Sequence, residues 1–191
     1  MADLRQRLGS LGPSELTGRN VRLDYLGDEH REALRAACAA DPAIWEIYTY
    51  SMLGEAFDAW WSKLAGGRFV LVAIAADRVV GMSSFYDIDG DNASVAIGGT
   101  YFVPDVRGRG VNDGVKRLML GAAFAAGARR VVFHVDAING RSRRAVEKLG
   151  ARLDGIMRRD RVTWTGRVRD TCVYSILDDE WPTVRARLDQ P

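Results

Sequence analysis

The sequence predicts an α+β fold with a mixed, mostly antiparallel central sheet flanked by helices. Between residues 69 and 103, apolar strand-like segments are separated by short turns, a pattern typical of antiparallel neighbours. Between residues 94 and 149, strand and helix patterns alternate, and such a crossover joins parallel strands. The 191 residues contain no internal repeat and no low-complexity linker. We therefore expect a single domain over residues 19–191, preceded by a partly ordered lead-in over residues 1–18.

The first part of the domain predicts one strand and two helices. Apolar and polar side chains alternate over residues 21–25, which predicts a strand. Asp28 is a suitable N-cap for a helix that continues to about residue 40, because Pro42 follows and disfavours further helix. Apolar side chains recur at helical spacing over residues 55–64, so a second helix is expected there.

The second part of the domain predicts most of the sheet. Gly127 and Gly150 follow helical patterns directly, where a left-handed residue often ends a helix. Thr165-Gly166 predicts a turn between the last two strands. The predicted strands are 69–76, 79–86, 94–103, 130–135, 152–162 and 168–177, and the predicted helices are 113–126, 140–149 and 179–188.

Composition and charge argue against several classes of protein. The net charge is +2, from 27 basic and 25 acidic residues, which is too small for a general nucleic-acid coat. No apolar stretch is long enough to span a bilayer, and the first residues lack the apolar core of a signal peptide. Cys38 and Cys172 form neither a disulfide framework nor a metal-ligand spacing, and we interpret His30 and His134 as structural or surface residues. We expect a cytoplasmic protein with no metal and with neither a membrane nor a nucleic acid as partner.

The segment with the clearest chemical meaning is Arg107–Asn112, which lies between a predicted strand and a predicted helix. A helix start presents unpaired N–H groups and the positive end of the helix dipole. Gly108 and Gly110 allow the backbone to approach an anion, and Arg107 and Arg109 add positive charge. The segment therefore predicts a pyrophosphate site.

Two common phosphate motifs do not fit this segment. It lacks the Gly-Lys-Ser/Thr ending of a nucleotide P-loop. A dinucleotide-binding fingerprint would stand at the first strand–helix turn, whereas three strands of the β-rich block precede this one. Short glycine motifs also occur by chance, so the local pattern alone leaves open an ordinary strand–helix connection with surface arginines.

The segment Ile97–Leu188 resembles the GNAT acetyltransferases, particularly their RimJ/RimL-like branch. The matching motifs open or close the two helices of this region and continue into the last strands. They are Arg107-x-x-Gly110, Asn139-x-x-Ser142, Lys148-Leu149-Gly150-Ala151, Gly166-x-x-x-Asp170, Tyr174-Ser175 and Glu180-Trp181. The earlier half of the chain agrees in its order of elements and in the Val80-Gly81 strand.

The resemblance implies an N-acetyltransferase that transfers the acetyl group of acetyl-CoA directly to a primary amine, on a protein N-terminus or a small molecule. It implies that the strand Gly98–Val103 is splayed from its neighbour, and that its amides bind the pantetheine arm and polarise the acetyl carbonyl. The residues implied for coenzyme binding are Phe102, Val103, Arg107, Gly108, Arg109, Gly110, Val111, Asn112, Asn139 and Ser142. Asn139 also fits an N-cap role for the helix that follows it.

The sequence departs from the family pattern at the catalytic acid and base. Val146 stands where the family tyrosine is expected, and Ala96 stands near the position of the usual glutamate on the splayed strand. Asn112 replaces the usual Gly or Ala of the arginine-glycine motif, a change that a helix start tolerates. The remaining candidates for proton transfer are Ser142, Tyr101 and Asp170, together with Tyr174, and both tyrosines also fit a core role. A water relay without a dedicated side chain stays open.

Aromatic residues of the N-terminal half are candidates for the acceptor pocket. Trp45 and Tyr48 follow Asp41-Pro42 in an irregular stretch, so we expect them to bind the acceptor. Trp60 and Trp61 lie at helical spacing and fit a hydrophobic core better.

Two other functions stay open from the sequence. The missing tyrosine and glutamate also fit a catalytically silent acyl-CoA-binding or regulatory module on the same fold. Nucleic-acid binding through the arginines of residues 141–148 and 158–161 has no aromatic stacking platform to support it. Pairing of the late strands could also make a homodimer.

Overall fold

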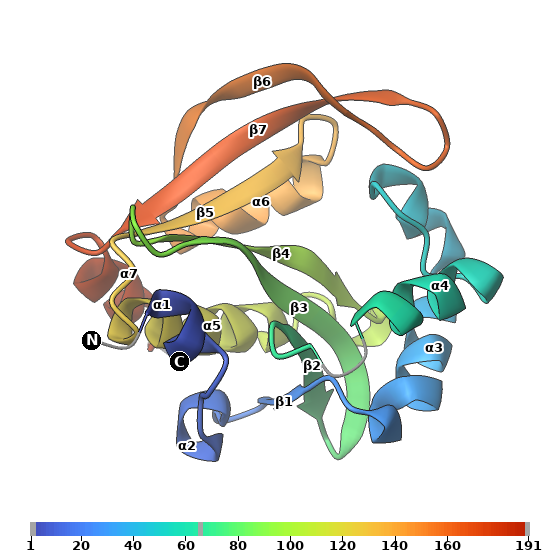
Figure 1. The fold of residues 1–191 in the computed structure, drawn as a ribbon, viewed down its shortest axis with the longest axis horizontal. Coiled ribbons are helices and arrows are strands. Elements are labelled where there is room, and N and C mark those ends of the chain that lie inside the picture. Colours follow the sequence, from blue (N-terminus) through green and yellow to red (C-terminus); the bar gives the residue numbers. More distant parts are fainter. Residues whose placement is uncertain (1–2, 65–66, 190–191) are drawn as a thin grey trace.

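A computed structural model describes residues 3–64 and 67–189 and shows a seven-stranded sheet in the order β1-β2-β3-β4-β5-β7-β6 (Figure 1). Neighbouring strands are antiparallel except β4 and β5, which run parallel. The strands are β1 (Arg22–Tyr25), β2 (Val70–Ala75), β3 (Arg78–Asp89), β4 (Ser94–Phe102), β5 (Arg130–Asp136), β6 (Arg152–Val162) and β7 (Val168–Leu177). The predicted α+β fold with a mixed, mostly antiparallel sheet is confirmed.

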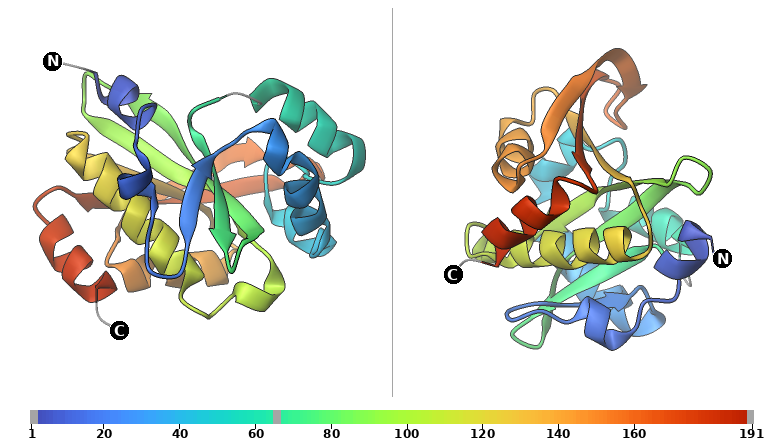
Figure 2. Two further views of the ribbon diagram at one scale, coloured as in Figure 1. Left: turned by 90° about the horizontal axis from the view of Figure 1, so that it is seen from below. Right: turned by 90° about the vertical axis from the view of Figure 1, so that its left-hand side faces the viewer.

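The helices surround this sheet (Figures 1 and 2). They are α1 (Leu4–Leu8), α2 (Pro13–Leu16), α3 (Arg31–Ala39), α4 (Gly54–Leu64), α5 (Val111–Ala125), α6 (Gly140–Leu149) and α7 (Trp181–Leu188), with short 3-10 turns at Asp28–His30, Pro42–Ile47 and Pro104–Val106. Gly150 ends α6 in a left-handed conformation with φ of 100°, as the sequence predicts. Within the described parts of the chain, no helix combines the length and the apolar character needed to cross a bilayer.

The lead-in is more ordered than the sequence suggests. In its described part, residues 3–18, helix α1 contacts β3 and helix α2 contacts α5. The Tyr25 hydroxyl accepts a hydrogen bond from the Leu11 amide at 2.8 Å and donates to the Leu8 carbonyl at 3.2 Å. The leucines that this arrangement buries are Leu4, Leu8, Leu11 and Leu16. The first two residues of the predicted lead-in lie outside the described residues.

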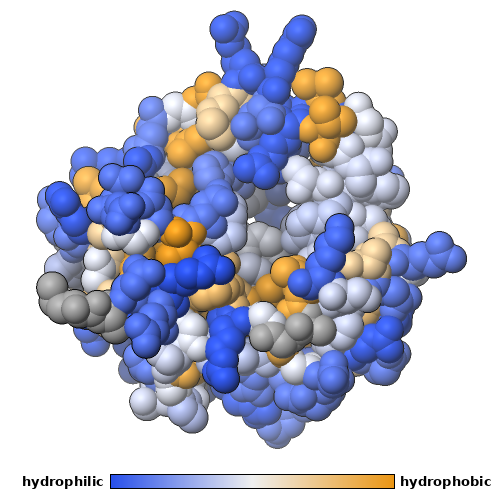
Figure 3. Space-filling model, in the orientation of Figure 1, coloured by the Kyte–Doolittle hydropathy of each residue, from blue (hydrophilic) through white to orange (hydrophobic). Residues whose placement is uncertain are grey.

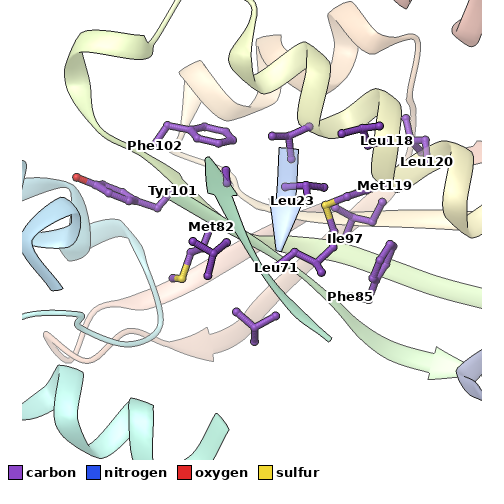
Figure 4. Packing of buried hydrophobic residues seen from close by; sticks show 14 of the residues in the cluster. Leu23, Leu71, Met82, Phe85, Ile97, Tyr101, Phe102, Leu118, Met119 and Leu120 are labelled. Atoms are coloured by element: carbon purple, nitrogen blue, oxygen red, sulfur yellow. The ribbon is translucent and has the colours of Figure 1, made fainter. Parts of the chain in front are cut away.

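Successive side chains of β4 point to opposite faces of the sheet, and this places α3 and α5. The Thr100 hydroxyl lies 2.7 Å from Nζ of Lys116 on α5, whereas the Tyr101 hydroxyl donates to the Ala37 carbonyl of α3 at 2.7 Å. Figure 4 shows Tyr101 and Phe102 leaving the strand on opposite sides. Helix α5 therefore covers one face of the sheet, called the α5 face below, and α3 covers the other, called the α3 face.

The sheet is nearly divided between β4 and β5. These strands pair over only three residues each, Ser94–Ala96 with Arg130–Val132. Beyond them, β4 pairs with β3 and β5 pairs with β7. The two strands separate toward their carboxyl ends, which confirms the splayed strand expected from the family resemblance.

A β-bulge lies in β4 where this separation begins. Met82 and Ser84 on β3 face Tyr101 and Gly98 on β4, so β4 carries one extra residue across this interval. Gly99 provides the bulge with a left-handed φ of 59°, which a residue with a Cβ atom adopts only with strain. The bulge turns the backbone of β4 at the edge of the opening.

Candidate active site

A cavity of about 960 Å³ fills the opening between β4 and β5. The hollow is visible near the middle of the surface in Figure 3. The N-terminal ends of α5 and α6 line it, as do the bulged part of β4 and the end of β5. Aromatic side chains on the α3 face, Tyr48 and Tyr50 among them, also line it. The cavity therefore passes through the sheet and joins its two faces.

The start of α5 provides an anion-binding end for this cavity. Gly110 is the N-cap residue, with φ of 78°, and no side chain caps the helix there. The amides of the first turn therefore lack a side-chain partner, and the positive end of the helix dipole faces the same region. Gly108, Gly110 and Asn112 line the cavity. This arrangement fits a pyrophosphate group.

Two residues of the same motif lie outside the cavity lining. Val111 is buried in the core at 6% exposure, so its side chain anchors the helix start and only its backbone remains available to a ligand. Arg109 is exposed to solvent. Neither side chain reaches the cavity wall, so a coenzyme contact by these two residues through their backbone stays a prediction.

Arg107 turns back toward the protein instead of standing free at the cavity mouth. Its Nε donates to the Phe102 carbonyl at 2.8 Å, and its Nη1 forms an ion pair with Asp41 at 2.6 Å. Its Nη2 is buried and has no hydrogen-bond partner among the described residues. Arg107 therefore joins the end of β4 to the segment after α3, and one donor is left over in a residue that lines the cavity. Such an orphaned donor fits an anionic ligand.

The predicted strand contacts, Phe102 and Val103, differ in where their amides point. The Val103 amide donates to the Val80 carbonyl of β3 at 2.9 Å, so it is not free to polarise an acetyl carbonyl. The expectation for Val103 is corrected accordingly. Backbone groups alternate in direction along a strand, so the Phe102 amide faces the side that β5 has left. Phe102 also lines the cavity.

Asn139 and Ser142 lie together at the start of α6. The Asn139 side chain accepts a hydrogen bond from the Ser142 amide at 3.0 Å, which confirms its N-cap role. Both residues line the cavity. The starts of α5 and α6 therefore line the same cavity, and a coenzyme contact by Asn139 and Ser142 stays a prediction.

The other candidates for proton transfer are engaged elsewhere. Tyr101 lines the cavity but is 1% exposed, and its hydroxyl donates to the Ala37 carbonyl. Asp170 lies outside the cavity lining, and its carboxylate accepts a hydrogen bond from the Arg159 amide at 2.7 Å. Tyr174 is buried and donates to Glu147 at 2.7 Å. Neither Asp170 nor the Tyr101 hydroxyl is placed to act on a ligand in the cavity.

The aromatic wall on the α3 face includes one of the two predicted acceptor residues. Tyr48 lines the cavity, and its hydroxyl donates to the Thr100 carbonyl at 2.6 Å, on the bulge. Trp45 does not line the cavity; it is fully buried, and its Nε1 donates to the Cys38 carbonyl at 2.9 Å. Trp60, expected in the core, lines the cavity instead.

A tyrosine–histidine pair also lines the cavity, and sequence reasoning assigned that histidine to structure or surface. Phe133 faces α5, because its ring lies 5.8 Å from Lys116 Nζ, so the next residue, His134, points to the α3 face. A hydrogen bond of 3.0 Å joins His134 Nδ1 to the Tyr86 hydroxyl. Burial lowers the pKa of His134, which keeps its imidazole neutral at neutral pH, and burial raises the pKa of Tyr86 to about 12.

Lys116 is the second cavity residue that sequence reasoning missed. It lies on α5 among apolar side chains and is only 4% exposed. Its Nζ lies 2.7 Å from the Thr100 hydroxyl and 3.4 Å from the Ser83 hydroxyl. Burial lowers its pKa to about 7. The sequence gives little signal for this burial, because Arg117 follows Lys116 directly and a Lys-Arg pair is typical of an exposed helix face.

Comparison with known proteins agrees with this architecture. The family model described as "Acetyltransferase (GNAT) domain" matches residues 20–152. An acetyltransferase structure from T. thermophilus is 34% identical with a TM-score of 0.83, and the match covers 91% of this chain and 94% of that one. A GCN5-related N-acetyltransferase from Brucella melitensis is 30% identical with a TM-score of 0.81, covering 90% and 81%.

A third structure, Mycobacterium smegmatis RimJ in complex with CoA-disulfide, shares the fold at 20% identity. Its TM-score is 0.75, and the match covers 88% of this chain and 87% of that one. No curated protein matches the sequence. The family model covers most of the chain, and the split sheet, the bulge and the uncapped start of α5 agree with it: the protein belongs to the GNAT acetyltransferase family.

Proposed function

We propose that the protein is an acetyl-CoA-dependent N-acetyltransferase that transfers the acetyl group directly to a primary amine. The observation that carries this proposal is the cavity through the split sheet. One end meets the uncapped start of α5, and the other end is walled by aromatic residues. Two ligands can therefore approach the same point from opposite faces, which direct transfer requires.

The α5 face is the proposed coenzyme side. The amides at the start of α5 and the orphaned Nη2 of Arg107 would hold the pyrophosphate. Asn139 and Ser142 would contact the coenzyme where α6 begins. The Phe102 amide faces the opening and would donate a hydrogen bond to the pantetheine arm. Amides near the bulge would polarise the acetyl carbonyl.

The α3 face is the proposed acceptor side. Tyr48 and the Tyr86–His134 pair form its wall around the opening. A neutral imidazole can accept a proton from an amine as the amine attacks, so His134 is the proposed proton acceptor. The resemblance to the RimJ/RimL-like branch favours an N-terminal α-amine of a peptide or protein as the acceptor. The two cysteines, Cys38 and Cys172, are buried and free, which supports a reducing compartment such as the cytoplasm.

Calorimetric titration with acetyl-CoA tests the coenzyme site. Gly110→Glu places a carboxylate at the proposed pyrophosphate position and should weaken binding more than about 100-fold through charge repulsion. Gly166→Glu is a matched control, because Gly166 also has a positive φ, of 84°, and open space around it, but lies in the β6–β7 turn. Equal affinity of both variants, or no binding by the wild-type protein, would contradict the proposed site.

A set of short peptides then tests the activity. Peptides with a free α-amine should release coenzyme A at a rate above background, and the same peptides with a formylated α-amine should not. Binding of acetyl-CoA without turnover on any peptide or small amine would favour the catalytically silent acyl-CoA-binding module instead.

A further inference from the structure

The amine of Lys116 is surrounded by hydroxyl groups and an aromatic ring, and no described carboxylate forms an ion pair with it. Its Nζ contacts two hydroxyl groups, Thr100 on β4 and Ser83 on β3, which lie 2.7 Å from each other. The Phe133 ring of β5 covers it from a third side at 5.8 Å. These contacts fix the amine at the bulge, on the coenzyme side of the opening.

The charged groups near this helix are used elsewhere. No carboxylate among the described residues lies within 4 Å of Lys116 Nζ, and Asp113, one turn earlier on α5, pairs with Lys148 at 3.1 Å. Several other titratable cavity residues, including Tyr48, Tyr86 and His134, lie on the α3 face, across the sheet. The cavity carboxylate Asp136 pairs with Arg167 at 2.5 Å. An unpaired cation is costly in such a place, so a structural role alone does not account for a lysine here.

The same cavity contains the position where the family tyrosine is missing. Val146 on α6 lines the cavity with an apolar side chain and cannot donate a proton. Lys116 enters the cavity from α5 and has both a mobile proton and a fixed position beside the bulge. We propose that the Lys116 ammonium group donates a proton to the sulfur of coenzyme A as the thiol leaves. This inference rests on the proposed function.

The proton balance of this step closes. The acceptor nitrogen forms a C–N bond with the acetyl carbon and loses one proton to His134 and then to water. As the C–S bond breaks, its electron pair stays on sulfur, and Lys116 Nζ gives that sulfur one proton. The neutral Lys116 amine then regains a proton from water. A pKa of about 7 suits this exchange, because both forms of the amine are populated at neutral pH.

The test follows kcat against pH with saturating acetyl-CoA and a peptide acceptor. The wild-type protein loses its proton donor as Lys116 deprotonates, so its pH profile should have a descending alkaline limb. Lys116→Met should still bind acetyl-CoA, should have a kcat at least about tenfold lower, and should lack that limb. Lys63→Met, which removes an exposed lysine of α4 outside the cavity, should keep the wild-type pH profile.

A second variant separates charge from proton donation. Lys116→Arg keeps a positive charge but does not release a proton, so it should still bind acetyl-CoA and lose at least about tenfold in kcat. The same kcat and the same pH profile in the wild-type protein and Lys116→Met would overturn the role of Lys116 while leaving the coenzyme site intact. Full activity of Lys116→Arg would also overturn it. Absence of coenzyme A binding by the wild-type protein would refute the proposed function and this inference together.

Discussion

Replacement of Lys116 by methionine should stabilise the protein at neutral pH and lose that advantage in alkaline solution. The ordinary pKa of 10.5 falls to about 7 in the folded state because of burial. Each pKa unit corresponds to about 1.4 kcal/mol, so the buried cation costs about 5 kcal/mol below about pH 7. The cost declines as the pH rises, since the unfolded chain also loses its proton, and it vanishes above about pH 10.5.

The substitution of Lys116 by methionine also removes two hydrogen bonds. Those from Lys116 to Thr100 and Ser83 are worth about 1 kcal/mol each, while the two hydroxyls keep their own hydrogen bond. The net gain for Lys116→Met should therefore be about 3 kcal/mol at pH 7 and close to zero near about pH 9.

Urea denaturation of the wild-type protein and the variant, repeated at several pH values, measures this difference directly. The comparison isolates Lys116 because every other titrating group is common to both proteins. Lys63→Met controls for the loss of one positive charge from the surface. A stability difference that stays constant between about pH 7 and pH 10 would refute the reasoning, because it would mean that the Lys116 pKa is the same in the folded and unfolded states.

Three further changes test the placement of single residues. Trp45→Ala should lower the free energy of unfolding by about 3–5 kcal/mol, because Trp45 is fully buried, and a loss under about 1 kcal/mol in urea denaturation would contradict its core position. Asn139→Ala should cost about 1 kcal/mol through loss of the α6 N-cap, whereas Asn139→Asp should keep the cap and most of that stability in the same assay. In a nuclear magnetic resonance titration, His134 should titrate below its ordinary pKa of about 6.5, and a midpoint above that value would remove the basis for its proposed role.

The fold could be predicted from the sequence because its signals are local. The turn at Thr165-Gly166 and the glycine that ends α6 mark element ends by backbone conformation, and the structure places both where the pattern predicts them. The lead-in was underestimated, since helices of five and four residues are too short to show a helical period. These two helices are held in place by leucines that pack against elements distant in the sequence. A local sequence pattern does not reveal such packing.

The site could be predicted only where it depends on the backbone. Gly110 and Asn139 act through helix geometry, and the sequence shows both. The direction of the Val103 amide depends on pairing with β3, and the burial of Trp45 depends on the packing of its ring against Tyr101 of β4, at 4.8 Å between ring centroids. Nothing in the sequence around Lys116 indicates a buried lysine. Its burial follows from the packing of α5 against the bulge of β4.

The narrow junction between β4 and β5 has a mechanical consequence. Strands β1 to β4 form one part of the sheet and strands β5, β7 and β6 form the other, and among the described residues three residue pairs connect the two parts. A ligand in the cavity would lie where β4 and β5 are no longer paired. Its contacts with both strands would connect the two parts of the sheet at this point. Binding of the proposed ligands would then stiffen the junction between β4 and β5 while holding the two reacting groups together.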